Sequence, residues 1–234
     1  HASGQAVGLP KGYDGNSEVG HRTIGSGQIT ETILTKFNNS IKNETISSNP
    51  VLISSLKALS PENKLHLIIL LSDAGVHSHH NHLYSIMEIA FKQNIKIVVH
   101  PILDGRDAPP RSAIKYLKIL NNVCAKTGAT IGSMHGRFFA MDRDNNWGRI
   151  EKSFNVLTSA KKIIETTWQD AINLSYQSGI SDEFIEPIRL SNEGKISSGD
   201  GIFFLNFRSD RALQLSKAFI QKEFTEFNRD ISPE

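Results

Sequence analysis

The sequence has little that would indicate a secreted or membrane-spanning protein. Its 234 residues contain a single cysteine, Cys124, which excludes a framework of intrachain disulfides and predicts a reducing, cytoplasmic location. No apolar run approaches the ~20 residues that a membrane-spanning helix needs. The first residues also lack a charged segment followed by an apolar one, so no secretion signal is expected.

An excess of charge of one sign is also lacking. The formal net charge is +2 at pH 7, which gives little bulk attraction to nucleic acid or to an acidic membrane. We therefore expect neither as a partner. The hydrophobic fraction of 38% and the aromatic fraction of 8% are typical of a globular chain. Any function of the basic residues must then come from local clustering.

Apolar runs of strand length alternate with segments of helical periodicity. The predicted strands are residues 65–71, 95–103, 129–134 and 201–207. The predicted helices are residues 28–42, 78–93, 110–126, 155–176 and 212–221. This alternation predicts an α/β fold with a mostly parallel sheet flanked by helices. The polar, turn-rich residues 186–199 are predicted to form a hairpin or loop.

Polar segments follow four of these strands, at residues 72–79, 104–111, 135–144 and 206–211. In an open parallel sheet, ligands bind outside the carboxyl ends of the strands, so we expect these segments to line one edge. Five arginines would converge there with His77 and Asp107, and they are Arg106, Arg137, Arg143, Arg208 and Arg211.

Clustered guanidinium groups have a clear chemical use. They bind carboxylate and phosphate with paired hydrogen bonds, each charge-assisted bond contributing about 1.5–3 kcal/mol. Arg208 and Arg211 are three residues apart at a predicted helix start, which itself favours anions. Asp107 among the arginines can act as a base. The pattern predicts a site for a small polyanionic ligand. Any one arginine alone is more often a surface or ion-pair residue, and only the presence of five at one edge makes a ligand site equally consistent with the pattern.

Two other clusters are candidate metal sites. His77, His79, His80 and His82 fit no tetrahedral template by their spacing, and a solvated helix start is the simpler interpretation. Residues 142–146 resemble the opening of a calcium loop. Because a tryptophan follows where that loop needs glycine, no calcium site is expected.

Ser17 lies in a polar turn between glycines, in the segment GNSEVGH at residues 15–21. Such a serine can be a nucleophile, and a turn serine or helix cap is the structural alternative. The chain begins at His1 with no strand before this turn. We therefore expect the sequence to be part of a longer protein.

Five segments together resemble the cofactor-independent (2,3-bisphosphoglycerate-independent) phosphoglycerate mutases of the alkaline-phosphatase-like superfamily. They are GNSEVGH (15–21), SDAGVHSH (72–79), LDGRDAPPRSA (103–113), GRFFAMDRD (136–144) and NFRSDRALQL (206–215), in the family's order. The resemblance implies a monomeric glycolytic isomerase that interconverts 3-phosphoglycerate and 2-phosphoglycerate through a phosphoserine. It also implies two divalent metal ions, manganese or another metal.

The resemblance assigns a role to each matching residue. Ser17 matches the nucleophile and one metal ligand, and Asp107 matches a proton shuttle on the glycerate hydroxyls. The implied substrate-binding residues are His77, Arg106, Asp107, Arg137, Arg143, Arg208 and Arg211. Ala74 and Ser209 replace a usual glycine and alanine, and neither change removes a charged group.

The resemblance further implies two domains. Residues 1–30 would be a remnant of a phosphatase domain with the nucleophile turn, and residues 31–234 a substrate-binding (transferase) domain without its last strand. Because the family's other metal ligands have no counterpart here, we expect this chain alone to be inactive. Two alternatives stay open, which are a metal-dependent phosphatase of the same superfamily and a non-catalytic phosphoglycerate-binding module.

Overall fold

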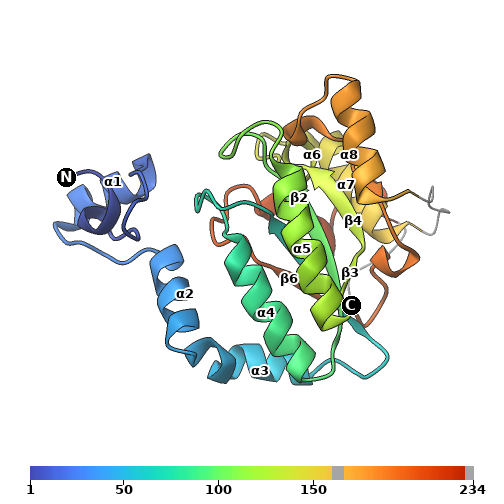
Figure 1. Cartoon of the computed structure of the whole chain (residues 1–234), viewed down its shortest axis with the longest axis horizontal. Coiled ribbons are helices and arrows are strands. Elements are labelled where there is room, and N and C mark those ends of the chain that lie inside the picture. The colour runs from blue at the N-terminus through green and yellow to red at the C-terminus, as the bar shows by residue number, and fades with distance from the viewer. Residues whose placement is uncertain (160–165, 230–234) are drawn as a thin grey trace. The chain divides into compact units, whose positions relative to one another are not determined.

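The computed structural model describes residues 1–159 and 166–229 of the chain (Figure 1). The chain divides into two compact units, His1–Ser54 and Ser55–Glu234. The boundary predicted between residues 30 and 31 separates two functional domains, which need not coincide with these compact units, and it stays a prediction.

The first unit is helical. Asn16 begins the second of its helices, because its side-chain oxygen accepts the N–H of Val19 at 3.2 Å. Thr32 likewise begins the third by accepting the N–H of Thr35 at 3.2 Å, so the helix predicted from residue 28 starts later. The elements are η1 (Gly4–Val7), α1 (Ser17–Ser26), α2 (Ile33–Lys42), η2 (Thr45–Ser48) and the start of α3 (Pro50–Lys57).

The second unit contains a sheet with the strand order β5-β4-β2-β1-β6, and β3 also pairs with β2. Every pair is parallel except β4 with β5, so the predicted mostly parallel α/β sheet is confirmed. The strands are β1 (Lys64–Leu70), β2 (Lys96–Leu103), β3 (Thr130–Ile131), β4 (Ser133–Gly136), β5 (Ile188–Arg189) and β6 (Gly201–Phe204).

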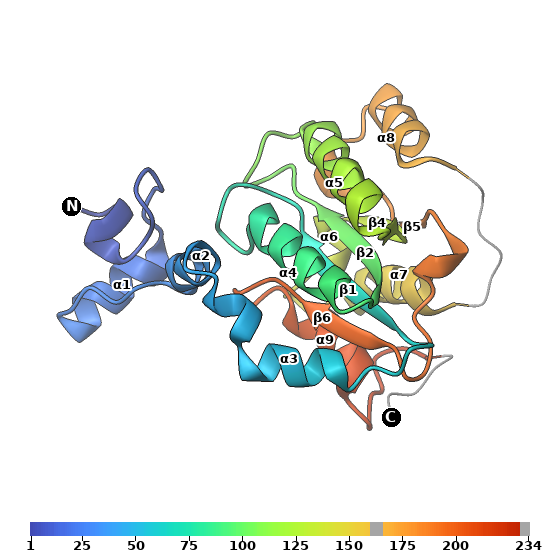
Figure 2. The same cartoon turned by 60° about the horizontal axis from the view of Figure 1, so that its bottom comes forward.

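Helices cover both faces of this sheet, which explains why every residue of β1 and β2 after the first lysine is buried (Figures 1 and 2). One face carries α4 (His80–Lys92) and α5 (Ala113–Thr127). The other carries α6 (Arg137–Ala140), α7 (Trp147–Thr158) and α9 (Leu213–Ile220). The chain also forms α8 (Trp168–Gln177), η3 (Asp182–Phe184) and η4 (Asn192–Gly194).

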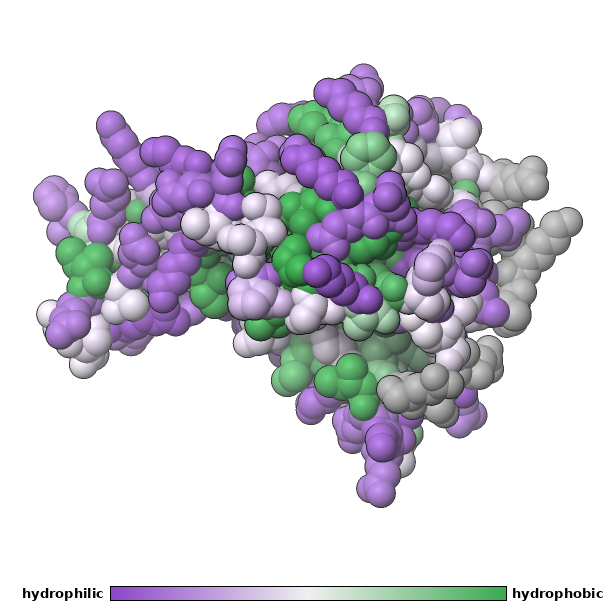
Figure 3. Space-filling model, turned by 90° about the horizontal axis from the view of Figure 1, so that it is seen from below, coloured by the Kyte–Doolittle hydropathy of each residue, from purple (hydrophilic) through white to green (hydrophobic). Residues whose placement is uncertain are grey.

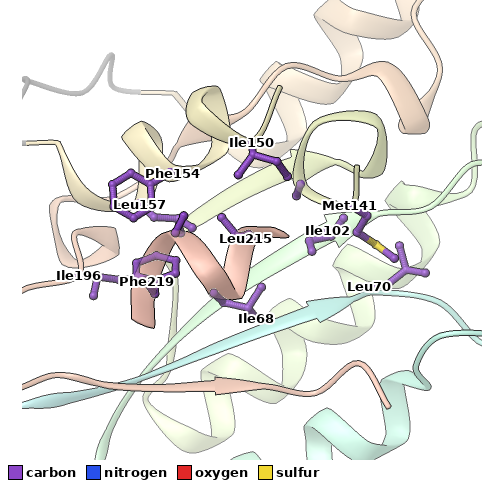
Figure 4. Packing of buried hydrophobic residues seen from close by; sticks show 12 residues of the cluster. Ile68, Leu70, Ile102, Met141, Ile150, Phe154, Leu157, Ile196, Leu215 and Phe219 are labelled. Atoms are coloured by element: carbon purple, nitrogen blue, oxygen red, sulfur yellow. The ribbon is translucent and has the colours of Figure 1, made fainter. Parts of the chain in front are cut away.

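The alternation of side chains along β1 supplies the core on the second face. Ile68 and Leu70 pack with Ile102 of β2 against α7 and α9 (Figure 4). Phe154 of α7 and Phe219 of α9 meet there with ring centroids 4.9 Å apart. This packing fixes the helices that follow the carboxyl ends of the strands.

Two predicted elements are each divided in the structure. The helix predicted over 155–176 is wrong, because α7 ends at Thr158 and α8 begins at Trp168, where Thr167 accepts the N–H of Asp170 at 3.1 Å. Residues 160–165 of that prediction lie outside the described residues. The strand predicted over 129–134 is interrupted at Gly132, where a Cβ would lie 2.6 Å from the Cα of Gly194.

No helix in the described part of the chain is long and apolar enough to cross a membrane. The face shown in Figure 3 exposes hydrophobic patches that polar residues border.

Five buried polar side chains form one continuous chain of hydrogen bonds across the sheet. The distances are 3.2 Å from Asp200 Oδ2 to His66 Nε2, 2.8 Å from His66 Nδ1 to His100 Nε2, and 2.7 Å from His100 Nδ1 to Ser133 Oγ. His135 Nε2 completes the chain at 2.7 Å from Ser133 Oγ. Because an ionised carboxylate only accepts, these bonds assign the Nε2–H tautomer to all three neutral imidazoles.

Acidification is expected to destabilise the fold between about pH 6.5 and pH 4. Burial lowers the pKa of His66 to about 4, that of His135 to about 3 and that of His100 well below its ordinary value. The unfolded chain takes up these protons near pH 6.5, so the free energy of unfolding falls as the pH decreases through this window. His66 alone contributes up to about 3 kcal/mol. Urea unfolding across this pH range measures the effect, and a constant free energy of unfolding would contradict it.

Candidate functional site

The carboxyl ends of β1, β2, β4 and β6 lie at the same edge of the sheet, because these strands are parallel. The segments that follow them bring together a histidine and a set of charged side chains, which we call the arginine edge. It consists of His77, Asp104, Asp107, Arg137, Arg143, Arg208, Asp210 and Arg211.

The loop after β2 is shaped by Asp104. Its Oδ1 accepts the backbone N–H groups of Arg106 at 3.1 Å and Asp107 at 2.9 Å, which is an Asx turn. Gly105 takes the left-handed conformation with φ 70°, and a Cβ there would lie 2.8 Å from the backbone nitrogen of Glu183. The turn therefore requires both an acceptor at 104 and glycine at 105.

Arg137 is the first residue of α6 and is buried at the end of β4. Its Nη1 lies 2.6 Å from Asp104 Oδ1 and 2.6 Å from Asp107 Oδ2. Burial lowers the pKa of Arg137, but its bonds to Asp107 and Asp104 outweigh that effect and hold the pKa above its ordinary value. Arg137 thereby fixes the carboxylate of Asp107.

A single carboxylate joins Arg143, which follows α6, to Arg208, which follows β6. Asp210 Oδ2 accepts from Arg143 Nη1 at 2.9 Å and from Arg208 Nη2 at 3.2 Å. Its Oδ1 lies 3.0 Å from Arg208 Nε. Burial raises the pKa of Asp210, but the charges of Arg208 and Arg143 outweigh it, so the net shift is downward.

Arg211 donates to the carbonyl oxygen of Met141 at 3.2 Å. Among the described residues, no carboxylate lies within 4.0 Å of its guanidinium. Burial and the positive charges of Arg143, Arg137 and Arg106 lower the pKa of Arg211. Arg143 and Arg208 therefore share the carboxylate of Asp210, and Arg211 pairs with none among the described residues, which leaves an excess of positive charge at the edge.

His77 lies between the two carboxylates. Its Nε2 is 3.7 Å from Asp107 Oδ2 and its Nδ1 is 3.9 Å from Asp210 Oδ1, both too long for hydrogen bonds. Burial, followed by the charges of Arg137 and Arg208, lowers the pKa of His77 to about 4. The ring is therefore neutral near pH 7 and can donate to a ligand with one nitrogen and accept with the other.

Arg106 is placed apart from these contacts. Its side chain is 58% exposed, and its Nη1 lies 3.8 Å from Glu183 Oε1. Of the predicted arginines, it is the most available to a ligand that approaches from solvent.

Sequence reasoning missed Asp104 and Asp210 as site residues. Their only signal was an aspartate beside each arginine in LDGRD and RSDR. The solvated interpretation of the histidine segment is wrong for His79 and His82, which are buried at the start of α4. The described residues contain no group of three or more His, Cys, Asp or Glu side chains that could hold a metal ion.

Ser17 lies in the first unit and is exposed at the first residue of α1, with Asn16 as the cap. Its Oγ is 3.1 Å from His21 Nδ1, and the same nitrogen is 2.7 Å from the carbonyl oxygen of Ser17. Because a carbonyl oxygen only accepts, Nδ1 carries the hydrogen. His21 in this arrangement cannot take the hydroxyl proton of Ser17.

The fold and the arginine edge together define an α/β protein with a cluster of arginines at the carboxyl edge of a mostly parallel sheet. The family described as "BPG-independent PGAM N-terminus" matches residues 37–234. The chain belongs to this family of phosphoglycerate mutases, which confirms the resemblance of its five segments.

Curated relatives support the same family. The 2,3-bisphosphoglycerate-independent phosphoglycerate mutase of Lawsonia intracellularis is 41% identical over 237 residues, which cover 100% of this chain and 46% of that protein. The enzyme of the same name from Thermosynechococcus vestitus is 44% identical, with 99% and 44% covered. The chain thus spans about half the length of the curated relatives it matches.

A solved structure has the same fold. The crystal structure of Leishmania mexicana phosphoglycerate mutase, described as determined at low cobalt concentration, superposes with a TM-score of 0.91 and 34% identity. The superposition covers 99% of this chain and 45% of the Leishmania mexicana chain.

Proposed function

We propose that the protein is a phosphoglycerate mutase, an isomerase that interconverts 3-phosphoglycerate and 2-phosphoglycerate. The observation that carries this proposal is the excess of positive charge at the arginine edge, where Arg143 and Arg208 share the carboxylate of Asp210 and Arg211 bonds to a carbonyl oxygen. Both substrates carry a carboxylate and a phosphate, the two anions that guanidinium groups bind best. The names of the curated relatives agree with this activity.

In the proposed reaction, Ser17 Oγ gives up its hydroxyl proton and attacks the phosphorus atom, and the bond from phosphorus to the glycerate oxygen breaks. In the second step the neighbouring glycerate hydroxyl attacks the phosphoserine, the bond from phosphorus to Ser17 Oγ breaks, and Ser17 regains its proton. The first glycerate oxygen takes up a proton, and the attacking glycerate hydroxyl loses one. Asp107 is the proposed carrier of these protons, because Arg137 holds its carboxylate in place. The helix start at Ser17 favours the negative charge of the phosphoserine.

The arginine edge, including His77, is proposed to hold the glycerate while the phosphoryl group moves. The two divalent metal ions that the resemblance implies, and Ser17 as a ligand of one, stay predictions. No step is assigned to them here, because the described residues contain no cluster that could hold a metal.

We also keep the predicted division into residues 1–30 with the nucleophile and 31–234 with the substrate site. A cytoplasmic location, a monomeric state, glycolytic use and inactivity of this chain alone likewise remain proposals.

The activity is tested on a protein that extends to the full length of the curated relatives, hereafter the full-length protein. Conversion of 3-phosphoglycerate to 2-phosphoglycerate without release of inorganic phosphate is expected. Release of inorganic phosphate in place of isomerisation would contradict the proposal and favour a phosphatase.

Arg208→Glu is expected to weaken the binding of 3-phosphoglycerate to this chain at least about tenfold, because it replaces charge-assisted hydrogen bonds by repulsion. Calorimetric titration measures the change. Lys92→Glu is the matched control, since Lys92 is exposed at the end of α4 that precedes β2, away from the carboxyl ends of the strands. Equal affinities of the two variants would remove Arg208 from the ligand site.

A further inference from the structure

Asp182 is a fully buried carboxylate that lies outside the arginine edge. Its Oδ2 accepts the backbone N–H groups of Ser112 at 2.8 Å and Ala113 at 2.9 Å. Its Oδ1 accepts the hydroxyl hydrogen of Tyr176. A buried carboxylate is costly unless its oxygens are hydrogen-bonded, so these three donors fix where Asp182 lies.

The two N–H groups belong to the start of α5, the helix that follows the loop after β2. Ser112 is the cap residue there, but its hydroxyl donates to Pro109 and makes no cap bond. Asp182 supplies the missing acceptor from a position 70 residues further along the chain. A negative charge is favourable at this end of a helix, where the N–H groups have no partner within it.

The same residue bonds to the loop 104–112 near its second end and packs closely against its first. The N–H of Asp182 donates to the carbonyl oxygen of Pro110 at 2.9 Å. At the other end, a Cβ on Gly105 would lie 3.0 Å from the Cβ of Asp182 and 2.8 Å from the nitrogen of Glu183. The loop cannot move toward residues 182 and 183 without a clash.

The neighbouring residues reach the segment that carries Arg137. Gly136 donates its N–H to the carbonyl oxygen of Ile185 at 2.8 Å, and a Cβ on it would lie 2.5 Å from the carbonyl oxygen of Glu183. Residues 182–185 therefore contact both segments whose side chains, Asp107 and Arg137, are bonded to each other at 2.6 Å.

We propose that Asp182 is a positioning residue for phosphoglycerate binding: it fixes the loop 104–112 so that Arg106 and Asp107 face the substrate. This inference rests on the proposed mutase function.

Asp182→Ala in the full-length protein is expected to raise the KM for 3-phosphoglycerate about tenfold or more, with a smaller change in kcat. Asp182→Asn is expected to stay within about threefold of the unchanged protein. Its amide oxygen can accept from Ser112 and Ala113 while its NH₂ group donates to the oxygen of Tyr176, so the three contacts survive the loss of charge.

Two further variants separate positioning from simple loss of stability. Asp170→Ala is the matched control, because Asp170 is exposed on α8 and, among the residues that the structure describes, its side chain bonds to Thr167 alone. It is expected to leave KM unchanged. Tyr176→Phe removes one donor to Asp182 and is expected to raise KM by less than Asp182→Ala, which keeps the test usable if the alanine variant does not fold.

Hydrogen exchange of the Ser112 and Ala113 amides reports on the loop directly, and both should exchange faster in Asp182→Ala and in Tyr176→Phe. No turnover by the unchanged protein would overturn the proposed function and the positioning role with it. Normal turnover by the unchanged protein, with KM the same in Asp182→Ala and Tyr176→Phe, would overturn the positioning role alone.

Discussion

Ser17→Ala is expected to lower mutase turnover by the full-length protein at least ~10⁴-fold and to abolish the phosphoenzyme, because alanine has no atom that can accept the phosphoryl group. The substitution should leave the fold intact. Ser17 is exposed at the start of α1, where alanine is a good helix former, and Asn16 supplies the cap. Turnover, and the intact mass after reaction with 3-phosphoglycerate, measure the effect.

Ser26→Ala is the matched control, because Ser26 ends the same helix, is exposed, and bonds only to the backbone of Gln28. It should retain full turnover and phosphorylation. Persistent turnover in Ser17→Ala would remove Ser17 as the nucleophile while leaving the arginine edge in place. His21→Gln provides a further check: since His21 Nδ1 donates to a carbonyl, its loss is expected to cost far less than the loss of Ser17.

Arg137→Ala is expected to lower the free energy of unfolding of this chain by about 3–5 kcal/mol. The guanidinium is 3% exposed and pairs with Asp104, which is 2% exposed, and with Asp107. Its removal leaves two carboxylates close together with no cation, and burial makes that charge costly. Urea unfolding monitored by circular dichroism measures the loss.

Arg106→Ala is the control for this stability prediction, since it removes the same charge from the neighbouring loop. Its side chain is 58% exposed and reaches Glu183 only at 3.8 Å, so a loss below about 1 kcal/mol is expected. The two variants should also differ in substrate affinity, because the side chain of Arg106 is exposed to a ligand in solvent whereas that of Arg137 is buried. A loss of equal size in both variants would contradict the assignment of Arg137 as a buried anchor.

Hydrophobic periodicity predicted the limits of an element well where a single apolar or helical pattern corresponds to a single strand or helix. The apolar runs of β1 and β2 are buried on both faces of a sheet, and their limits were predicted to within one residue. Periodicity failed at two breaks. Gly132 divides a predicted strand because Gly194, distant in the sequence, packs against it, and this contact has no signal in the local sequence. Thr167 begins a new helix inside a continuous helical pattern by accepting the N–H of Asp170, a local capping pattern that periodicity does not register.

The candidate site shows the same division. The arginines could be assigned to one edge because parallel strands place their carboxyl ends together. Asp182 could not be found this way, since it acts on α5 from 70 residues away through backbone N–H groups, which every residue has. The sequence shows Asp210 between Arg208 and Arg211. Only the distances in the structure show that Asp210 is the shared acceptor of Arg208 and Arg143.

The sequence by itself determined the α/β class, the edge that carries the arginines, and the family. These follow from periodicity and from motifs in which the reactive residues are neighbours along the chain. Only the tertiary structure decided which charges neutralise one another, that His77 is a neutral ring, and that Arg211 keeps its charge without a carboxylate beside it. The physical reason is that burial and ion pairing depend on distances between segments far apart in sequence, and no local pattern encodes those distances.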